Sequence, residues 1–152
     1  MEKTKQQTQI LEKTAIVNGK NLPVGLKHAI ALSKFIRGKD IDVAIKQLED
    51  VARMRMAIPM AGEIPHRRGM NKTSGSGRYP VKGAGEFIRL LKSLKANAIV
   101  KEIELEKYVV HAIPNNASRP YKRFGQGRMK RCHVTIKLIA KKINTEKSKE
   151  KK

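Results

Sequence analysis

Six cationic side chains are gathered in the thirteen residues Arg119–Arg131, a density that suits the binding of phosphate groups. Guanidinium and ammonium groups this close together repel one another unless anions lie between them. Arginine can also hold two phosphate oxygens at once, because its N–H donors form a planar fork. The run lies within Lys107–Thr145, a stretch that contains no Asp or Glu. This chemistry indicates a polyanionic partner, and we expect that partner to be nucleic acid.

Two aromatic residues stand among these cations and could stack on unpaired bases. Stacking would contribute about 1–3 kcal/mol for each base engaged, although packing within a hairpin explains both rings equally well. Gly125 and Gly127 favour a turn and a close approach of the backbone to RNA. The predicted RNA-binding residues of this segment are Arg119, Tyr121, Lys122, Arg123, Phe124, Arg128, Lys130 and Arg131.

A second cationic segment is the stretch 58–80, which has no helical or strand periodicity. Loops this long inside a compact domain are usually functional or disordered. We expect this loop to become ordered on RNA, with backbone amides near its glycines donating to phosphates, and a solvated linker is the alternative. The predicted RNA-binding residues of the loop and of the turn after it are Arg67, Arg68, Arg78 and Lys82.

The chain as a whole is strongly basic. Its 152 residues include 34 Lys and Arg against 13 Asp and Glu, which gives a formal net charge of +21. Solubility alone does not require so much charge, so the composition agrees with a polyanionic partner. Hydrophobic residues make up 39% of the chain, with no Trp and only three Phe and three Tyr. We therefore expect one modest aliphatic core, without the aromatic strand signature of an RNA-recognition motif.

Apolar residues recur at helical spacing in three segments. They predict helices over Pro23–Gly38, Asp40–Met56 and Val81–Asn97. Gly38 is placed to end the first helix, and Asp40 is a good N-cap for the second.

Alternating apolar residues predict strands over Tyr108–Ile113 and Cys132–Ala140, which would pair antiparallel around the basic tip. A weaker strand signal covers Ile10–Val17, before an expected turn at Asn18–Gly19. We predict an α+β fold, with three helices packed on a small antiparallel sheet with an extended basic β-hairpin, residues 108–140.

The chain is predicted to form one domain between two tails. Residues 1–9 are polar and are expected to form a disordered tail. Residues 10–140 are expected to form a single RNA-binding domain that includes the loop 58–80 and the hairpin 108–140. Residues 141–152 are a Lys-rich tail that we expect to be solvated or loosely bound to phosphates.

Other kinds of chemistry find no support in the sequence. The segment Gly75–Lys82 lacks the Gly-Lys-Ser/Thr of a P-loop, and the four histidines and one cysteine match no zinc pattern. We interpret the histidines as core or RNA-facing residues, with His133 among the RNA-binding candidates, and Cys132 as a buried hydrophobe. No acidic residue is arranged with a histidine or nucleophile for acid–base catalysis. We therefore expect no enzyme activity, no cofactor, no metal and no small-molecule substrate.

The charge alone also permits a free-standing nucleic-acid chaperone or DNA-compacting protein, which would bind many sequences with steep salt dependence. A helix-turn-helix is disfavoured, because the cations are spread around the first two helices. A membrane-surface protein would need a free apolar helix face, whereas these apolar stripes are needed for the core. The first residues show no signal-peptide pattern and no window is long enough to cross a bilayer, so we expect a cytoplasmic protein without a membrane partner.

Four short segments then suggest a family. In order and spacing they resemble the universal large-subunit ribosomal protein twenty-two family, in its archaeal type. The resemblance covers about Ile16 to Ala140, and the long loop, in which His66–Gly69 leads to Gly77–Pro80, is similar to the archaeal and eukaryotic version. The segments are Leu-Pro-Val-Gly-Leu-Lys-His-Ala at 22–29, Phe-Ile-Arg-Gly-Lys at 35–39, Gly-Arg-Tyr-Pro-Val-Lys at 77–82 and Ala-Asn-Ala at 96–98.

The resemblance implies a structural constituent of the large ribosomal subunit, near the peptide exit tunnel. The hairpin would penetrate large-subunit ribosomal RNA, and its tip would contribute to the tunnel wall. Partners would be this RNA, neighbouring large-subunit ribosomal proteins and nascent peptide at the tip. Lys122 and Arg123 match the basic pair of the family's tip, and His133 stands at the family's histidine position on the returning strand.

The arm departs from the family pattern, because it looks several residues short between Phe124 and Arg131. At about 3.3 Å per strand residue, the loss of a few residues on each side retracts a tip by on the order of 10 Å. We expect RNA binding to tolerate that change, whereas contact with nascent peptide depends on it.

Overall fold

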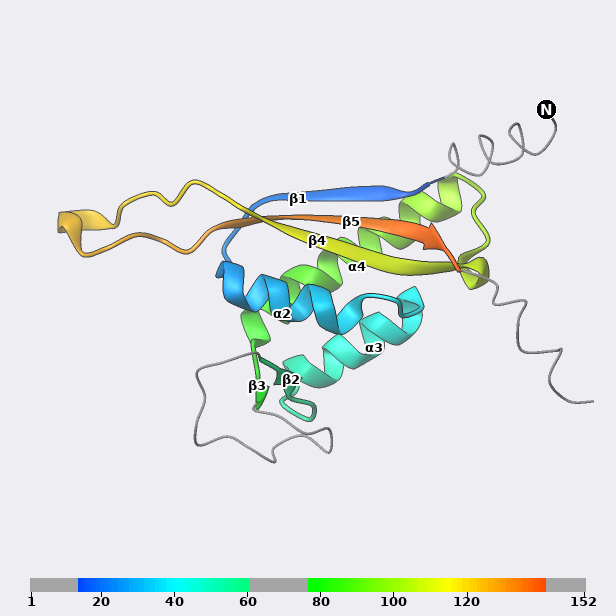
Figure 1. Ribbon diagram of the computed structural model, residues 1–152, viewed down its shortest axis with the longest axis horizontal. Coiled ribbons are helices and arrows are strands. Elements are labelled where there is room, and N and C mark those ends of the chain that lie inside the picture. Colours follow the sequence, from blue (N-terminus) through cyan, green and yellow to red (C-terminus); the bar gives the residue numbers. More distant parts are fainter. Residues whose placement is uncertain (1–13, 61–76, 142–152) are drawn as a thin grey trace, which may run out of the picture.

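The computed structural model describes residues 14–60 and 77–141. Three helices cover one face of a three-stranded antiparallel sheet, and a long arm leaves one end of the sheet (Figure 1). The predicted α+β fold, with three helices on a small antiparallel sheet, is confirmed. The predicted tail 1–9, the predicted tail 141–152 apart from Lys141, and Arg67 and Arg68 of the loop lie outside the described residues.

The sheet has the order β1-β5-β4, with β5 in the centre. Its strands are β1 (Ile16–Leu22), β4 (Tyr108–Asn116) and β5 (Cys132–Ala140). In β5 the side chains of Cys132, Val134, Ile136 and Leu138 are buried, and those between them are more exposed. This period of two is what a strand with one face on a core requires, and it confirms the predicted strand at its predicted bounds.

The helices are α2 (Leu26–Ile36), α3 (Ile41–Ala52) and α4 (Val81–Val100). α2 lies against β4, α4 lies against β1, and α3 packs beside α4. Their apolar faces meet the sheet in a mainly aliphatic core, in which Phe87 is the one fully buried aromatic side chain of the described residues. The large, fully buried side chains of this core include Leu32, Leu48, Phe87, Leu91 and Ile136.

The helix ends follow local chemistry in part. Gly38 has φ +77, the left-handed conformation that ends a helix, as predicted from its position after α2. Asp40 is the N-cap residue of α3, but its side chain makes no cap hydrogen bond. Its carboxylate instead pairs with Lys141 Nζ at 2.8 Å, which holds the end of β5 against α3. α4 continues past Asn97 to Val100, so the predicted helix was three residues short.

The turn predicted at Asn18–Gly19 is wrong, because both residues lie within β1 and pair with β5. The Oγ1 of Thr135 donates a hydrogen bond to Asn18 Oδ1 at 3.0 Å, so the side chains also link the two strands. Gly19 is explained by packing against α4, since a Cβ there would lie 2.7 Å from Leu90 Cδ1. The glycine therefore permits close approach of the helix to the strand and does not form a turn.

The outer edge of β4 is covered by the connection between α2 and α3. Backbone hydrogen bonds join Gly38 N–H to Val110 O and Val110 N–H to Lys39 O, both at 2.9 Å. The guanidinium of Arg37 adds a bond to Ala112 O at 3.1 Å. β4 is thus held on both sides, which gives the arm a firm base.

The ends of the loop 58–80 also have more structure than the sequence predicts. β2 (Ile58–Pro59) and β3 (Gly77–Arg78) form a short antiparallel pair. Ile58 is fully buried in the core, so this pair anchors both described ends of the loop beside α2.

Candidate nucleic-acid interface

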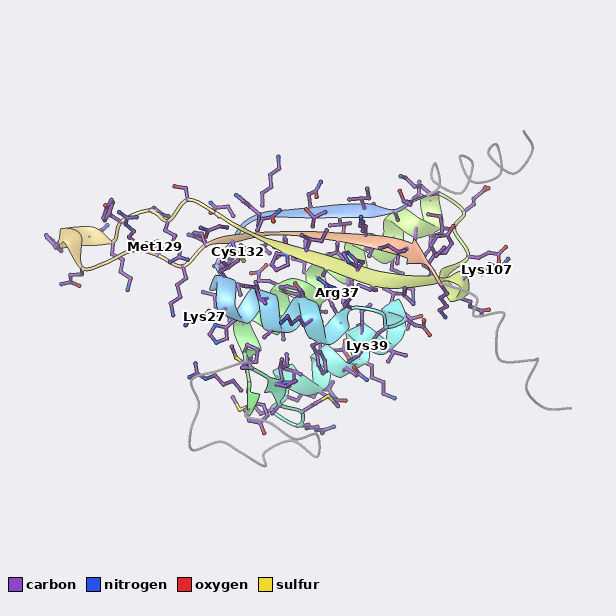
Figure 2. All side chains as sticks on the ribbon, viewed as in Figure 1. Lys27, Arg37, Lys39, Lys107, Met129 and Cys132 are labelled. Atoms are coloured by element: carbon purple, nitrogen blue, oxygen red, sulfur yellow. The ribbon has the colours of Figure 1, made fainter. Side chains whose placement is uncertain are left out.

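The arm is the segment between β4 and β5. The paired ladder ends at Asn116 and Cys132, and the fifteen residues between them extend away from the sheet (Figure 1). Figure 2 shows Cys132 where the arm joins the sheet and Met129 further out along it. The side chains of residues 119–130 are all exposed, so the predicted arm residues from Arg119 to Lys130 face solvent.

Few contacts hold the two sides of the arm together. Within the arm, the one bridge of strand type joins Tyr121 to Arg128. Backbone bonds from Lys122 N–H to Gly127 O at 2.9 Å and from Met129 N–H to Pro120 O at 2.8 Å flank it. The predicted extended hairpin is therefore present, but as two loosely joined strands and not as a continuous ladder.

The tip of the arm is a tight turn that presents an aromatic ring. A one-turn 3₁₀ helix, η2 (Arg123–Gly125), forms the end of the arm. The φ angles of Phe124, Gly125 and Gly127 are positive, at 56°, 67° and 95°. A non-glycine residue in this region is uncommon, and its strain is retained mostly at functional positions. Phe124 is 93% exposed. An apolar ring held out in this way is available for stacking on a base.

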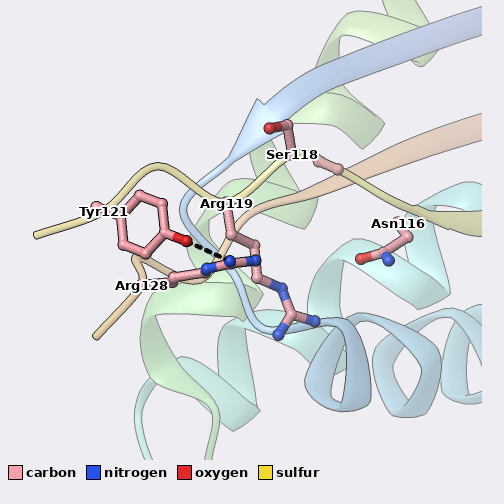
Figure 3. A pocket seen from close by; sticks show the side chains of 6 residues that line it. Asn116, Ser118, Arg119, Tyr121 and Arg128 are labelled. Carbon is pink, nitrogen blue, oxygen red and sulfur yellow. Dashed lines mark hydrogen bonds between the residues drawn. The ribbon is translucent and has the colours of Figure 1, made fainter. Parts of the chain in front are cut away.

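Tyr121 is placed differently, because Arg128 engages it from the opposite side of the arm. The Arg128 guanidinium carbon lies 4.6 Å from the centre of the Tyr121 ring, and its Nη2 donates a hydrogen bond to the phenol oxygen (Figure 3). This contact sets the orientation of both side chains. Base stacking at Tyr121 would therefore have to add to, or replace, a contact within the protein.

Arg119 lies beside this pair and completes a hollow on the arm. Asn116, Ser118 and the backbone at Ala117 line the rest of it (Figure 3). The hollow presents two guanidinium groups, a phenol, a hydroxyl and an amide, all of which can bond to phosphate or ribose oxygens.

Two predicted residues near the base of the arm have structural contacts. The backbone N–H of Asn21 donates to His133 Nδ1 at 3.0 Å, so this histidine links β5 to the end of β1. Arg131 has a buried Nε with no hydrogen-bond partner among the described residues, while its Nη2 lies 4.0 Å from Met129 Sδ. A desolvated guanidinium without an anion favours an anionic partner.

Three further predicted residues meet at the base of the arm. Arg78 lies in β3, Lys82 lies in the first turn of α4, and Lys130 lies on the returning side of the arm. Lys82 and Lys130 line the same groove, and His28 and Tyr79 join them there. Neither His28, one of the four histidines interpreted as core or RNA-facing, nor Tyr79 was among the predicted RNA-binding residues. Tertiary packing brings both to this place.

Nine of the predicted RNA-binding residues thus fall into three places, apart from Arg131 and His133 at the join of the arm and the sheet and from Arg67 and Arg68 outside the described residues. The tip carries Lys122, Arg123 and Phe124, the hollow carries Arg119, Tyr121 and Arg128, and the base carries Arg78, Lys82 and Lys130. Their role in RNA binding stays a prediction.

Cysteine and metal-ligating side chains elsewhere in the described residues suggest no further functional site. Cys132 is fully buried, and burial raises the pKa of its thiol, which suits a small core residue and not a nucleophile. The described residues contain no group of three or more His, Cys, Asp or Glu placed to hold a metal ion. In the part of the chain that the structure describes, no helix is long and apolar enough to cross a membrane.

A small α+β domain that carries an acid-free cationic arm defines a class of basic proteins whose charge suits contact with a polyanion. The chain belongs to the family described as ribosomal protein L22p/L17e, whose model matches residues 17–139. This family membership makes it a ribosomal protein and confirms the resemblance predicted over Ile16 to Ala140.

Archaeal relatives support the same assignment. The chain is 42% identical over 104 residues to large ribosomal subunit protein uL22 of Archaeoglobus fulgidus, a match covering 66% of each chain. It is 39% identical over 116 residues to the protein of that name in Methanocaldococcus jannaschii, and 36% identical over 118 residues to that of Ignicoccus hospitalis, each match covering 74% of both chains. The chain is therefore of the archaeal type.

Proposed function

We propose that this protein is a structural constituent of the large ribosomal subunit that binds and bridges large-subunit ribosomal RNA. It helps to form the region around the polypeptide exit tunnel and works in the cytoplasm as part of the ribosome. Its partners are this RNA and neighbouring large-subunit ribosomal proteins, with nascent peptide at the tip of the arm. It acts by binding and not by turnover, so it is not an enzyme and needs no cofactor.

The main support for the proposal is the composition and structure of the arm between Asn116 and Cys132. It holds six cations and no acid, and few bonds join its two sides. In water such a segment gains little by pairing its two sides as a hairpin, because the pairing buries no core and brings like charges together. Between RNA strands the same segment would neutralise phosphates on both of its sides, which bridges RNA segments that are apart in sequence.

Two arm arginines test the proposal directly. In cells that express tagged wild type or Arg123→Ala/Arg128→Ala, we expect the variant to enter large subunits about tenfold less well or worse. Charge-assisted hydrogen bonds contribute about 1.5–3 kcal/mol each, so the loss of two bridging guanidinium groups should be plainly visible. The measurement is the ratio of the two tagged chains in purified subunits.

A matched control removes the same charge from the helices. Lys46 on α3 and Lys92 on α4 are exposed, and Lys46→Ala/Lys92→Ala leaves the arm intact. This variant should enter subunits like the wild type. Equal incorporation of the arm variant would overturn the proposal.

The free-standing chaperone remains the competing class, since net charge alone permits it. Such a protein would bind RNA and DNA of any sequence and would be removed by salt. Stable incorporation into one subunit separates the two functions.

A further inference from the structure

A groove at the base of the arm is lined by three segments that are distant in sequence. They are the start of α2 at Gly25 and His28, the start of α4 from Tyr79 to Lys82, and Lys130 of the arm. A second hollow adjoins it, shares His28 and Tyr79, and adds Arg78. The groove thus opens toward the arm on one side and toward the described end of the loop on the other.

Lys130 is held in the groove by close packing on a glycine. A Cβ at Gly25 would lie 3.3 Å from Lys130 Cδ and 3.5 Å from His28 Nδ1. The aliphatic part of the lysine therefore crosses Gly25, the N-cap residue of α2, where a side chain would obstruct it. This contact joins the returning side of the arm to the helical layer.

The charged side chains that line the groove are cationic. Lys82, Lys130 and Arg78 supply cations, and the described lining residues include no Asp or Glu. Burial first, and then Arg78 and Lys130, lower the pKa of His28 below its ordinary value, so the cations are near enough to oppose a further charge.

Two helix ends add to the same potential. In the described chain neither α2 nor α4 has an acidic residue in its first turn, and neither N-cap makes a side-chain hydrogen bond. Free N–H groups at a helix start carry partial positive charge, and a cation such as Lys82 is unfavourable there. The groove therefore has several positive groups around it, and its described lining residues include no acidic side chain to offset them.

We infer that this groove is a distinct phosphate-binding site for ribosomal RNA, in which one backbone phosphate lies between Lys82, Lys130 and the first turns of α2 and α4. The inference rests on the proposed function and names a site and residues, His28 and Tyr79 included, that the arm alone does not supply. RNA is favoured over a free anion because the groove continues into the cationic arm, along which the same strand can extend.

The test uses the full chain and reads the ring resonances of His28 by NMR. The probes are inorganic phosphate and a ten-nucleotide oligouridylate. A phosphate beside His28 stabilises its imidazolium against Arg78, Lys82 and Lys130, so the pKa of His28 should rise when either probe binds. Because the arm adds contacts to RNA alone, the oligonucleotide should act at a far lower concentration than phosphate does.

Lys82→Ala/Lys130→Ala should abolish this shift in the pKa of His28. Both lysines are exposed, so their removal should leave the fold intact. The slope of log K against log salt for the oligonucleotide should become shallower by about 0.7 in this double variant, because the two lysines neutralise one phosphate. Lys92→Ala, ten residues further along α4, is the control and should keep the shift.

The outcomes separate this inference from the proposed function. If the oligonucleotide moves arm resonances while His28 keeps its pKa, the groove is not a phosphate site and RNA binding by the arm stands. If His28 shifts equally in the double lysine variant, the inference is also contradicted. A response to inorganic phosphate without any response to RNA would show a small-anion site and would overturn the RNA assignment.

Discussion

The two aromatic residues of the arm, alike in the sequence, differ in the structure. Tyr121 is 67% exposed and is held by Arg128, whereas Phe124 is 93% exposed at the tip. The arm therefore has one ring that stiffens it and one that is free to contact RNA. Packing within the hairpin therefore describes Tyr121, whereas base stacking by Phe124 stays a prediction.

Phe124→Ala should weaken binding of the full chain to large-subunit ribosomal RNA about 5- to 150-fold, because stacking of one base contributes about 1–3 kcal/mol. The melting temperature should not change, since this ring buries no core. Filter binding and thermal unfolding measure the two quantities. Phe124→Tyr keeps the ring and should keep the affinity; an unchanged affinity in Phe124→Ala would show that the ring stacks on no base.

The pKa values of two histidines should make the stability of the free chain depend on pH. Burial lowers the pKa of both His28 and His111 from the ordinary 6.5, with Arg37 and Lys137 adding to the effect at His111. As pH falls below about 6.5 the unfolded chain takes up these protons before the folded chain does, so the free energy of unfolding falls. The loss of stability is complete once the pH is below the pKa values of both histidines in the folded chain.

Thermal unfolding at pH 7.5 and pH 5.5 should therefore show a loss of stability that is smaller in His28→Gln/His111→Gln. Carboxylates titrate mainly below this window, which limits their contribution. An equal loss of stability in the variant would mean that other groups cause it.

At the scale of elements, substitutions at two glycines should change the free energy of unfolding in opposite directions. Gly19→Val should destabilise the chain by about 1–3 kcal/mol, because its side chain would displace Leu90 at the contact between β1 and α4. Gly85→Ala should stabilise it by about 0.5–1 kcal/mol, since a Cβ in this helical position meets nothing within 4 Å. Urea unfolding measures both changes, and a neutral Gly19→Val would contradict the close packing.

The elements also show what could be read from the sequence. β5 was predicted at its observed bounds because four buried residues alternate along it, and a period of two is a local signal. β1 was misplaced because Asn18–Gly19 is locally a turn pattern, whereas pairing with β5 decides its conformation. The groove was not predicted at all, because Gly25, Tyr79 and Lys130 are brought together only by the tertiary fold.

For the whole molecule, the η2 turn lies at the far end of the arm (Figure 1), whereas the groove is lined by Lys130 near the base of the arm and by the starts of α2 and α4. We expect the tip and the groove to bind separate phosphates. The free-energy losses of Arg123→Ala/Arg128→Ala and Lys82→Ala/Lys130→Ala in RNA binding should then add within about 0.5 kcal/mol. Isothermal titration of the full chain with large-subunit RNA measures them. A combined loss well below the sum would show that the two sites serve one contact.

The central claim is that the chain is an integral part of the large subunit, and sucrose-gradient fractionation of a native lysate tests it most directly. The lysate is washed at high salt, and the fractions are probed for the chain. Many phosphate contacts with a folded RNA, together with neighbouring proteins, should keep it with the large subunits through the wash. Release to the top of the gradient while the subunits stay intact would contradict the account and favour a loosely bound nucleic-acid chaperone.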